Sequence, residues 1–101
     1  NNCIKAWRGI GWCSFISQKH EQAMKYYEKI IEQKPLAIDY MNAGHVAWVM
    51  GDIQKASVFY GKAITASGNR ERFLEMFHKD EEALLTQGIR EEDIPLMLDL
   101  L

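Results

Sequence analysis

Histidine and cysteine are the side chains in this 101-residue sequence with the most scope for metal binding or nucleophilic catalysis. His20, His45 and His78 fall on three separate predicted helices. None lies four residues from another His or Cys, the spacing that places two metal ligands on one helix face. Acidic residues 80–82 follow His78, but consecutive side chains point in different directions around a helix, so we interpret them as a solvated face. The sequence therefore predicts no metal site and no cofactor.

Two other candidate signals lack the context that their chemistry requires. Gly9 and Gly11 are spaced like part of a phosphate-binding loop, but they lie inside an apolar predicted helix rather than after a strand. Cys13 lies in the same helix, where an unpaired cysteine usually behaves as a small buried hydrophobe rather than as a nucleophile. We therefore expect a protein that is not an enzyme.

The two cysteines also bear on the compartment. Cys3 and Cys13 are ten residues apart, which is about 15 Å along a helix and too far for a disulfide with each other. Two unpaired thiols weakly favour a reducing, cytoplasmic compartment and otherwise leave the localisation unknown. Because the sequence begins with Asn rather than Met, we expect it to be a fragment.

Composition and charge exclude several classes of protein. The sequence is 48% hydrophobic and 26% charged, with a net charge of −2, as is typical of a folded globular domain. The charge is uneven: residues 1–62 carry eight Lys/Arg and five Asp/Glu, whereas residues 63–101 carry four and nine. No face gathers the dense basic stripe that nucleic acid requires, and no segment has the length and apolarity of a membrane span.

The elements that must position any site are organised around one predicted helical hairpin over residues 40–64. Gly51 can adopt the left-handed conformation that ends a helix, and Asp52 can cap the helix that follows. Small and large residues recur at helical spacing on both arms: Tyr40, Ala43, Gly44 and Ala47 on the first, then Ile53, Ala56, Tyr60, Ala63 and Ile64 on the second. We expect the small residues to let the two helices approach closely, with the tyrosines filling the space beside them.

The same pattern occurs 33 residues earlier, where Trp7, Gly11, Ala23 and Tyr27 superpose on Tyr40, Gly44, Ala56 and Tyr60. The order of residue types is an aromatic, an apolar–Gly pair, an Ala-x3-aromatic and, in the first copy, Pro35. In this order the chain resembles the tetratricopeptide repeat family. Ankyrin repeats have a similar period, but their Thr-Pro-Leu-His turn is absent here.

This resemblance implies an all-α fold, a right-handed α-solenoid of antiparallel helix pairs in one domain. Repeat one would span about residues 4–36 and repeat two about 37–68, followed by divergent capping helices over 69–101. From the residue pattern we expect helices over 3–17, 20–34, 40–50, from Ile53 onward, and over 70–87. The last segment, 94–101, is almost wholly apolar and must be covered by something.

The resemblance also implies a non-catalytic scaffold or adaptor that binds a protein or peptide on its concave face. In the family, this face is supplied by the first helix of each repeat. Carried onto this sequence, the peptide-binding residues would be Arg8, Trp12, Ile16, Met41, Asn42, His45, Trp48 and Val49, extended by Arg72 and Met76. Coverage of these residues by an adjoining repeat or by the helix over 70–87 is an equally open alternative.

Some members of the family clamp a C-terminal carboxylate with Lys, Arg and Asn on this face. Arg8 and Asn42 match such positions, but Trp12 stands where an Asn would be and Met76 where a basic residue would be, so the clamp is incomplete. The partner is therefore an unidentified protein or peptide. Two alternatives are a self-association module that forms a homodimer through the groove or the last helix, and a regulatory appendage of a larger protein.

Overall fold

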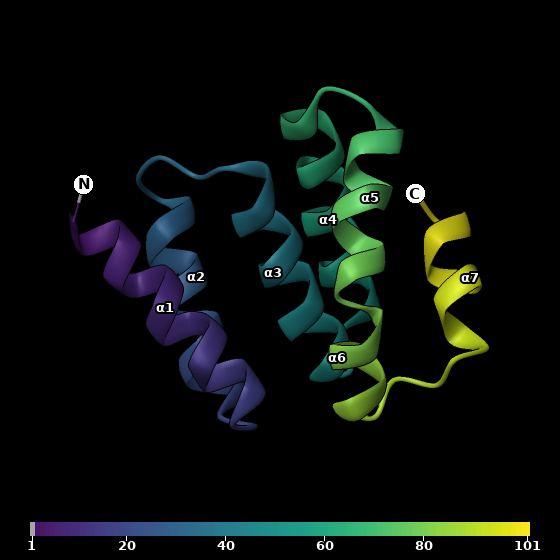
Figure 1. Ribbon diagram of the computed structural model, residues 1–101, viewed down its shortest axis with the longest axis horizontal. Helices are drawn as coiled ribbons and strands as arrows, with labels where there is room; N and C mark the ends of the chain where they lie inside the picture. Colours follow the sequence, from purple (N-terminus) through teal and green to yellow (C-terminus); the bar gives the residue numbers. More distant parts are fainter. Residues whose placement is uncertain (1) are drawn as a thin grey trace.

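The computed structural model describes residues 2–101, with side chains from Cys3 onward, and over this range it is helical with connecting turns (Figure 1). The helices in chain order are α1 (Asn2–Ile16), α2 (His20–Ile31), α3 (Ala37–Val49), α4 (Ile53–Ser67), α5 (Arg70–Lys79), α6 (Glu81–Thr86) and α7 (Asp93–Asp99). Helices α1 and α2 form one antiparallel pair and α3 and α4 the next. The chain thus forms an α-solenoid of helix pairs, as predicted. No helix within residues 2–101 is long and apolar enough to cross a bilayer.

In each helix pair, a glycine of the first helix lies against a tyrosine ring of the second, so that the two helices come close together. A Cβ atom at Gly11 would lie 3.1 Å from ring carbons of Tyr27, and one at Gly44 would lie 2.7 Å from ring carbons of Tyr60. Both tyrosine side chains are fully buried. The spacing of small and aromatic residues in the sequence therefore corresponds to two equivalent points of close helix contact.

The turn between α3 and α4 has the predicted chemistry. Gly51 has a φ of +89°, which L side chains rarely adopt, and this conformation ends α3. The Asp52 side chain accepts a hydrogen bond from the Lys55 backbone N–H at 3.0 Å and so caps α4.

Three predicted boundaries are wrong. Helix α2 ends at Ile31 rather than at residue 34, and Pro35 disfavours a helical conformation in Lys34. Helix α3 begins at Ala37, where the Asp39 carboxylate accepts a hydrogen bond from the Leu36 backbone N–H at 2.7 Å. The predicted helix over 70–87 is broken at Asp80, which lies between α5 and α6.

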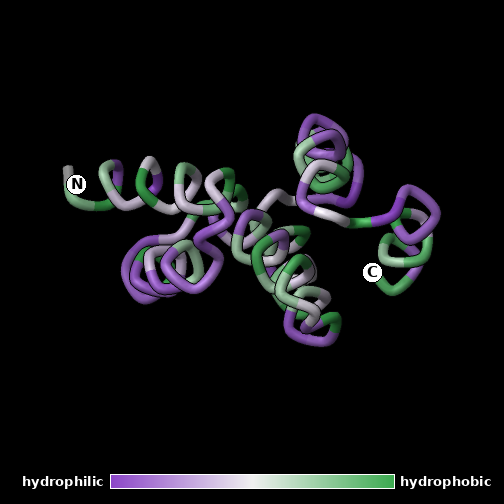
Figure 2. The backbone as a smooth tube through the Cα atoms, turned by 90° about the horizontal axis from the view of Figure 1, so that it is seen from below, coloured by the Kyte–Doolittle hydropathy of each residue, from purple (hydrophilic) through white to green (hydrophobic). Residues whose placement is uncertain are grey.

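Helix α3 is the centre of the molecule. It lies between α1–α2 on one side and α4–α5 on the other, and eight of its thirteen residues are buried. Figure 2 shows the same order across the long dimension of the molecule, with the N-terminus at one end and α7, beside the C-terminus, at the other. The first repeat's core is therefore continuous with that of the second through α3.

Helix α6 is tied back to the first repeat by Gln87. The Gln87 Nε2 group donates to the Phe15 carbonyl at 2.9 Å, and the Gln87 Oε1 atom accepts from the His20 Nε2–H at 2.7 Å. These hydrogen bonds join residues that are 72 and 67 positions apart in the chain.

Both cysteines are free and exposed. The expectation that Cys13 is buried is therefore wrong, because α1 turns Gly11, Ser14 and Phe15 toward the protein and leaves Cys13 on the outer face.

Candidate functional site

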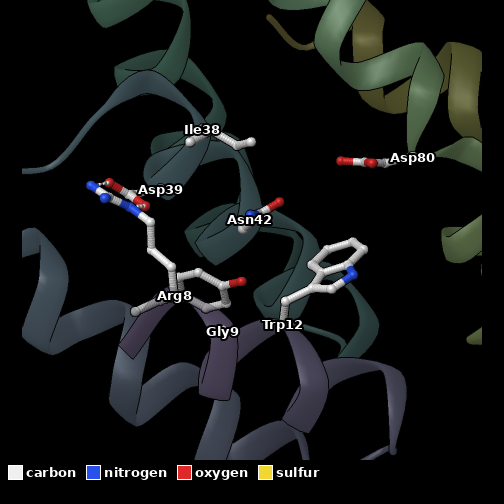
Figure 3. Close-up of a pocket in the computed structure, with 8 residues that line it drawn as sticks. Arg8, Gly9, Trp12, Ile38, Asp39, Asn42 and Asp80 are labelled. Carbon is white, nitrogen blue, oxygen red and sulfur yellow. Dashed lines mark hydrogen bonds and ion pairs between the residues drawn. The ribbon is translucent and has the colours of Figure 1, made fainter. Parts of the chain in front are cut away.

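A hollow of about 350 Å³ lies on the concave side, between α1 and the α5–α6 junction, with α3 as its floor (Figure 3). We call it the α1–α3 hollow. Its walls are formed by Arg8, Gly9 and Trp12 from α1, Tyr27 from α2, Ile38, Asp39 and Asn42 from α3, and Asp80. A volume of this size accommodates one long side chain or a short stretch of peptide.

One end of the hollow is an ion pair within the protein. The Arg8 guanidinium donates from Nε to Asp39 Oδ1 at 2.7 Å and from Nη2 to Asp39 Oδ2 at 2.8 Å. Asp39 is fully buried, and the hydrogen bond to it raises the pKa of the Arg8 guanidinium. The charge of Arg8 is therefore compensated by Asp39, and its position is fixed.

At the other end, Asp80 is held by a buried hydrogen-bond chain. The Tyr60 hydroxyl donates to His45 Nδ1 at 2.6 Å, and His45 Nε2–H donates to Asp80 Oδ2 at 3.0 Å. Burial lowers the pKa of His45, while Asp80 opposes this shift. The imidazole is therefore neutral, and the His45–Asp80 contact is a hydrogen bond rather than an ion pair. The Asp80 side chain is 21% exposed and lines the hollow.

Two polar atoms that line the hollow have no partner in the described part of the chain. They are the Tyr27 hydroxyl and the Asn42 Oδ1 atom, both of which are buried. Burial raises the pKa of the Tyr27 hydroxyl, with the nearby Asn42 side chain opposing the shift, so the phenol stays protonated. Buried polar groups are nearly always paired with protein, water or ligand. These two atoms therefore mark the part of the hollow where a water molecule or a ligand group would complete the hydrogen bonding.

The structure brings together three of the residues that sequence reasoning placed on the concave face, namely Arg8, Trp12 and Asn42. Ile16 and Arg72 are exposed, and Val49 and Met76 are partly buried, but none of these four lines the hollow.

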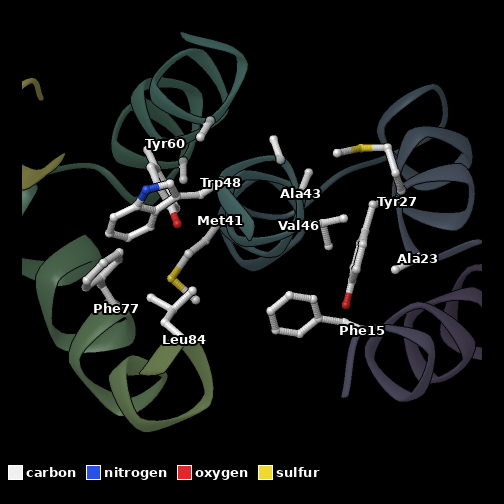
Figure 4. Close-up of a cluster of buried hydrophobic side chains, with 14 of the residues drawn as sticks. Phe15, Ala23, Tyr27, Met41, Ala43, Val46, Trp48, Tyr60, Phe77 and Leu84 are labelled. Atoms are coloured by element: carbon white, nitrogen blue, oxygen red, sulfur yellow. The ribbon is translucent and has the colours of Figure 1, made fainter. Parts of the chain in front are cut away.

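The expectation that Met41, His45 and Trp48 present their side chains to the groove is wrong. Their exposed fractions are 1%, 0% and 6%. Helices α5 and α6 pack on this face of α3: the His45 ring lies 5.5 Å from that of Phe77, and Met41 points toward Leu84 (Figure 4). The covering helix, which the sequence left as an open alternative, accounts for the burial of Met41 and His45, whereas Trp48 lies beside α7.

Sequence reasoning missed Tyr27, Asp39 and Asp80 as residues of the hollow. Tyr27 was assigned to the contact between helices, which is correct, but it also lines the hollow. For Asp39 the sequence did contain a signal of a buried ion pair, because Asp39 is a charged residue at the apolar start of α3. Asp80 was assigned to a solvated face, and only the break between α5 and α6 directs it inward.

A second hollow, of about 460 Å³, lies between α7 and the turn that joins α3 to α4. We call it the α7 hollow. It is lined by Trp48, Ile53, Asp93, Leu96, Met97, Asp99 and Leu100. Helix α7 buries Ile94 and Met97 but leaves Leu96 and Leu100 62% and 63% exposed. Only one side of this apolar helix is therefore covered within the chain.

The fold and its repeated glycine–tyrosine contacts define a helical-repeat protein built from antiparallel helix pairs. The sequence pattern of the tetratricopeptide repeat family matches residues 4–35 and 40–70, which is more than half of the chain. The chain therefore belongs to the tetratricopeptide repeat family. Such repeats generally mediate protein–protein interactions and are typically non-catalytic scaffolds. No curated protein and no solved structure gave a significant match.

Proposed function

We propose that this chain is a protein-binding scaffold that holds an extended segment of its partner in the α1–α3 hollow. The observation that carries the proposal is the pair of unpartnered buried atoms, Tyr27 OH and Asn42 Oδ1, beside the partly exposed ring of Trp12. A bound segment supplies an N–H donor for Asn42, from its main chain or from a side chain, and a carbonyl acceptor for Tyr27. Trp12 adds an aromatic surface of the kind that anchors peptides.

We further propose that residues 69–101 act as the cap of a single domain whose repeats span about 4–36 and 37–68. The supporting observation is that α5 and α6 cover the apolar face of α3 that contains Met41 and His45. Without such a cover, this face would expose a large apolar surface at the end of the stack.

An internal segment suits the hollow better than a C-terminal carboxylate. Arg8 is already paired with Asp39, and Arg72 does not line the hollow. Asp80 would repel a carboxylate. The hollow therefore disfavours a terminal carboxylate and favours a segment that passes through it.

Replacing Asn42 by alanine should weaken peptide binding about tenfold while leaving the free protein equally or more stable. The first effect follows because a hydrogen bond to the ligand is lost. The second follows because the variant removes a buried acceptor that has no partner. The probes are peptides enriched on the parent protein from a random phage-displayed library. Their affinities would be measured by calorimetry, and stability by thermal unfolding.

Gln54→Ala is the matched control, because Gln54 is exposed on α4, away from the hollow. It should bind the enriched peptides as the parent does. Failure to enrich any peptide, or equal affinity of Asn42→Ala and the parent, would count against the proposed function.

The exposed side of α7 favours self-association as a second candidate function. Replacing Leu96 and Leu100 by serine should then abolish any rise of solution mass with concentration, because both side chains are largely exposed and line the α7 hollow. The measurement is sedimentation equilibrium on the parent and the double variant, with circular dichroism to confirm equal helicity. A parent that stays monomeric over the concentration range would rule this candidate out.

A further inference from the structure

We propose that the α1–α3 hollow recognises the guanidinium group of an arginine side chain in the bound segment. This inference rests on the proposed function and adds the identity of the partner's side chain that the hollow binds. It follows from the charges, the hydrogen-bonding atoms and the shape of the hollow.

The charge of the hollow is negative. Arg8 and Asp39 cancel one another in a two-point ion pair. Asp80 has no such partner among the described residues, because the imidazole that donates to it from His45 is neutral. The charged groups that line the hollow thus sum to about −1, a balance that attracts a cation and disfavours an anion.

The free hydrogen-bonding capacity is mostly that of an acceptor. The Asn42 Oδ1 atom is unpartnered, and of the two Asp80 oxygens only Oδ2 receives a hydrogen bond within the described chain. In Figure 3 the Asn42 oxygen points toward the side of the hollow where the Asp80 carboxylate lies. Two acceptors on opposite sides of one small space call for a ligand with several donors between them.

Arginine matches this arrangement better than lysine does. Its guanidinium is planar and presents five N–H donors in a fixed fork, so one group can donate to a carboxylate and an amide oxygen simultaneously. The same plane can stack on the indole of Trp12, which forms the wall beside Asn42. A hollow of about 350 Å³ is large enough for this side chain.

The test uses N-acetyl-arginine methylamide as the probe, with the citrulline and lysine analogues for comparison. Citrulline has nearly the same shape as arginine but no charge. We expect saturable shifts of the Trp12 indole N–H and the Asn42 side-chain amide resonances in ¹⁵N spectra of the protein. The arginine probe should bind about tenfold or more tightly than the citrulline probe, because a hydrogen bond to a charged group is the stronger one.

Asp80→Asn should weaken binding of the arginine probe by a similar factor. The asparagine oxygen can still accept the hydrogen bond from His45, so the fold is retained, and circular dichroism would verify this. Glu82→Gln is the matched control, because it removes the same charge from an exposed position on α6 outside the hollow. It should bind the arginine probe as the parent does.

Equal affinity for the arginine and citrulline probes, or an unchanged affinity in Asp80→Asn, would overturn the inference. Equal affinity for the lysine probe would overturn the assignment to a guanidinium. Library peptides that need Asn42 but contain no arginine would leave the proposed function standing without this inference. Resonance shifts with the arginine probe, combined with a library that yields no enriched peptide, would support the guanidinium site and count against the proposed binding of an extended segment.

Discussion

Replacing Gly44 by alanine should destabilise the protein by about 1–3 kcal/mol. The new Cβ atom would lie 2.7 Å from two ring carbons of Tyr60, well inside van der Waals contact. The ring has no room to retreat, because it packs against the rings of His45, Phe73 and Phe77 at centroid distances of 5.4, 5.8 and 5.6 Å. Intrinsic helix propensity alone would favour alanine by about 1 kcal/mol, so the sign of the change tests the steric argument. Urea unfolding monitored by circular dichroism measures it.

Gly61→Ala provides the comparison, because Gly61 lies in α4 and a Cβ atom there would meet nothing within 4 Å. It should stabilise the protein by roughly 0.5–1 kcal/mol. If both substitutions were stabilising, the close contact between α3 and α4 would not exist as described.

Lowering the pH below about 6.5 should destabilise the protein, by up to about 1.4 kcal/mol per pH unit. Burial lowers the pKa of His45 below its ordinary value of 6.5. In that range the unfolded chain binds a proton at this histidine, whereas the folded protein keeps it neutral between the Tyr60 hydroxyl and Asp80. The free energy of unfolding therefore falls with decreasing pH until the folded-state pKa is reached. Urea unfolding at a series of pH values above the range of carboxylate titration measures the slope.

His45→Gln identifies the source of that slope. Glutamine can accept from Tyr60 and donate to Asp80 but does not titrate. The variant should be less stable than the parent at neutral pH, with a clearly smaller loss of stability below pH ~6.5. The same slope in both proteins would assign the pH dependence to groups other than His45.

The parts of the fold that the sequence predicted are those fixed by local and periodic patterns. The contact of Gly44 with Tyr60 and the turn at Gly51-Asp52 follow from spacing and backbone chemistry within one hairpin. The register of the family repeat placed Trp12 and Asn42 on the concave side, where both line the hollow.

The parts that the sequence did not predict depend on contacts between distant residues. Arg8 and Asp39 are 31 positions apart, and His45 and Asp80 are 35. Periodicity identifies the apolar face of α3, but it does not say which helix covers that face or how far the cover extends. The break at Asp80 ends α5 and places the Asp80 carboxylate within hydrogen-bonding distance of His45. This break therefore determines how α5 and α6 cover α3.

The hydrogen bonds of Gln87 change how the repeats depend on one another. In an open array of helical repeats each unit contacts only its neighbours, so stability adds along the chain and an end can melt while the rest stays folded. Here Gln87, just after α6, bonds to the Phe15 carbonyl and to His20, and so joins the last part of the stack to the first. The network of contacts is closed rather than linear. Opening of the α1–α2 turn then breaks contacts of α6, and the reverse, which couples the unfolding of the first repeat to that of the helix after the second.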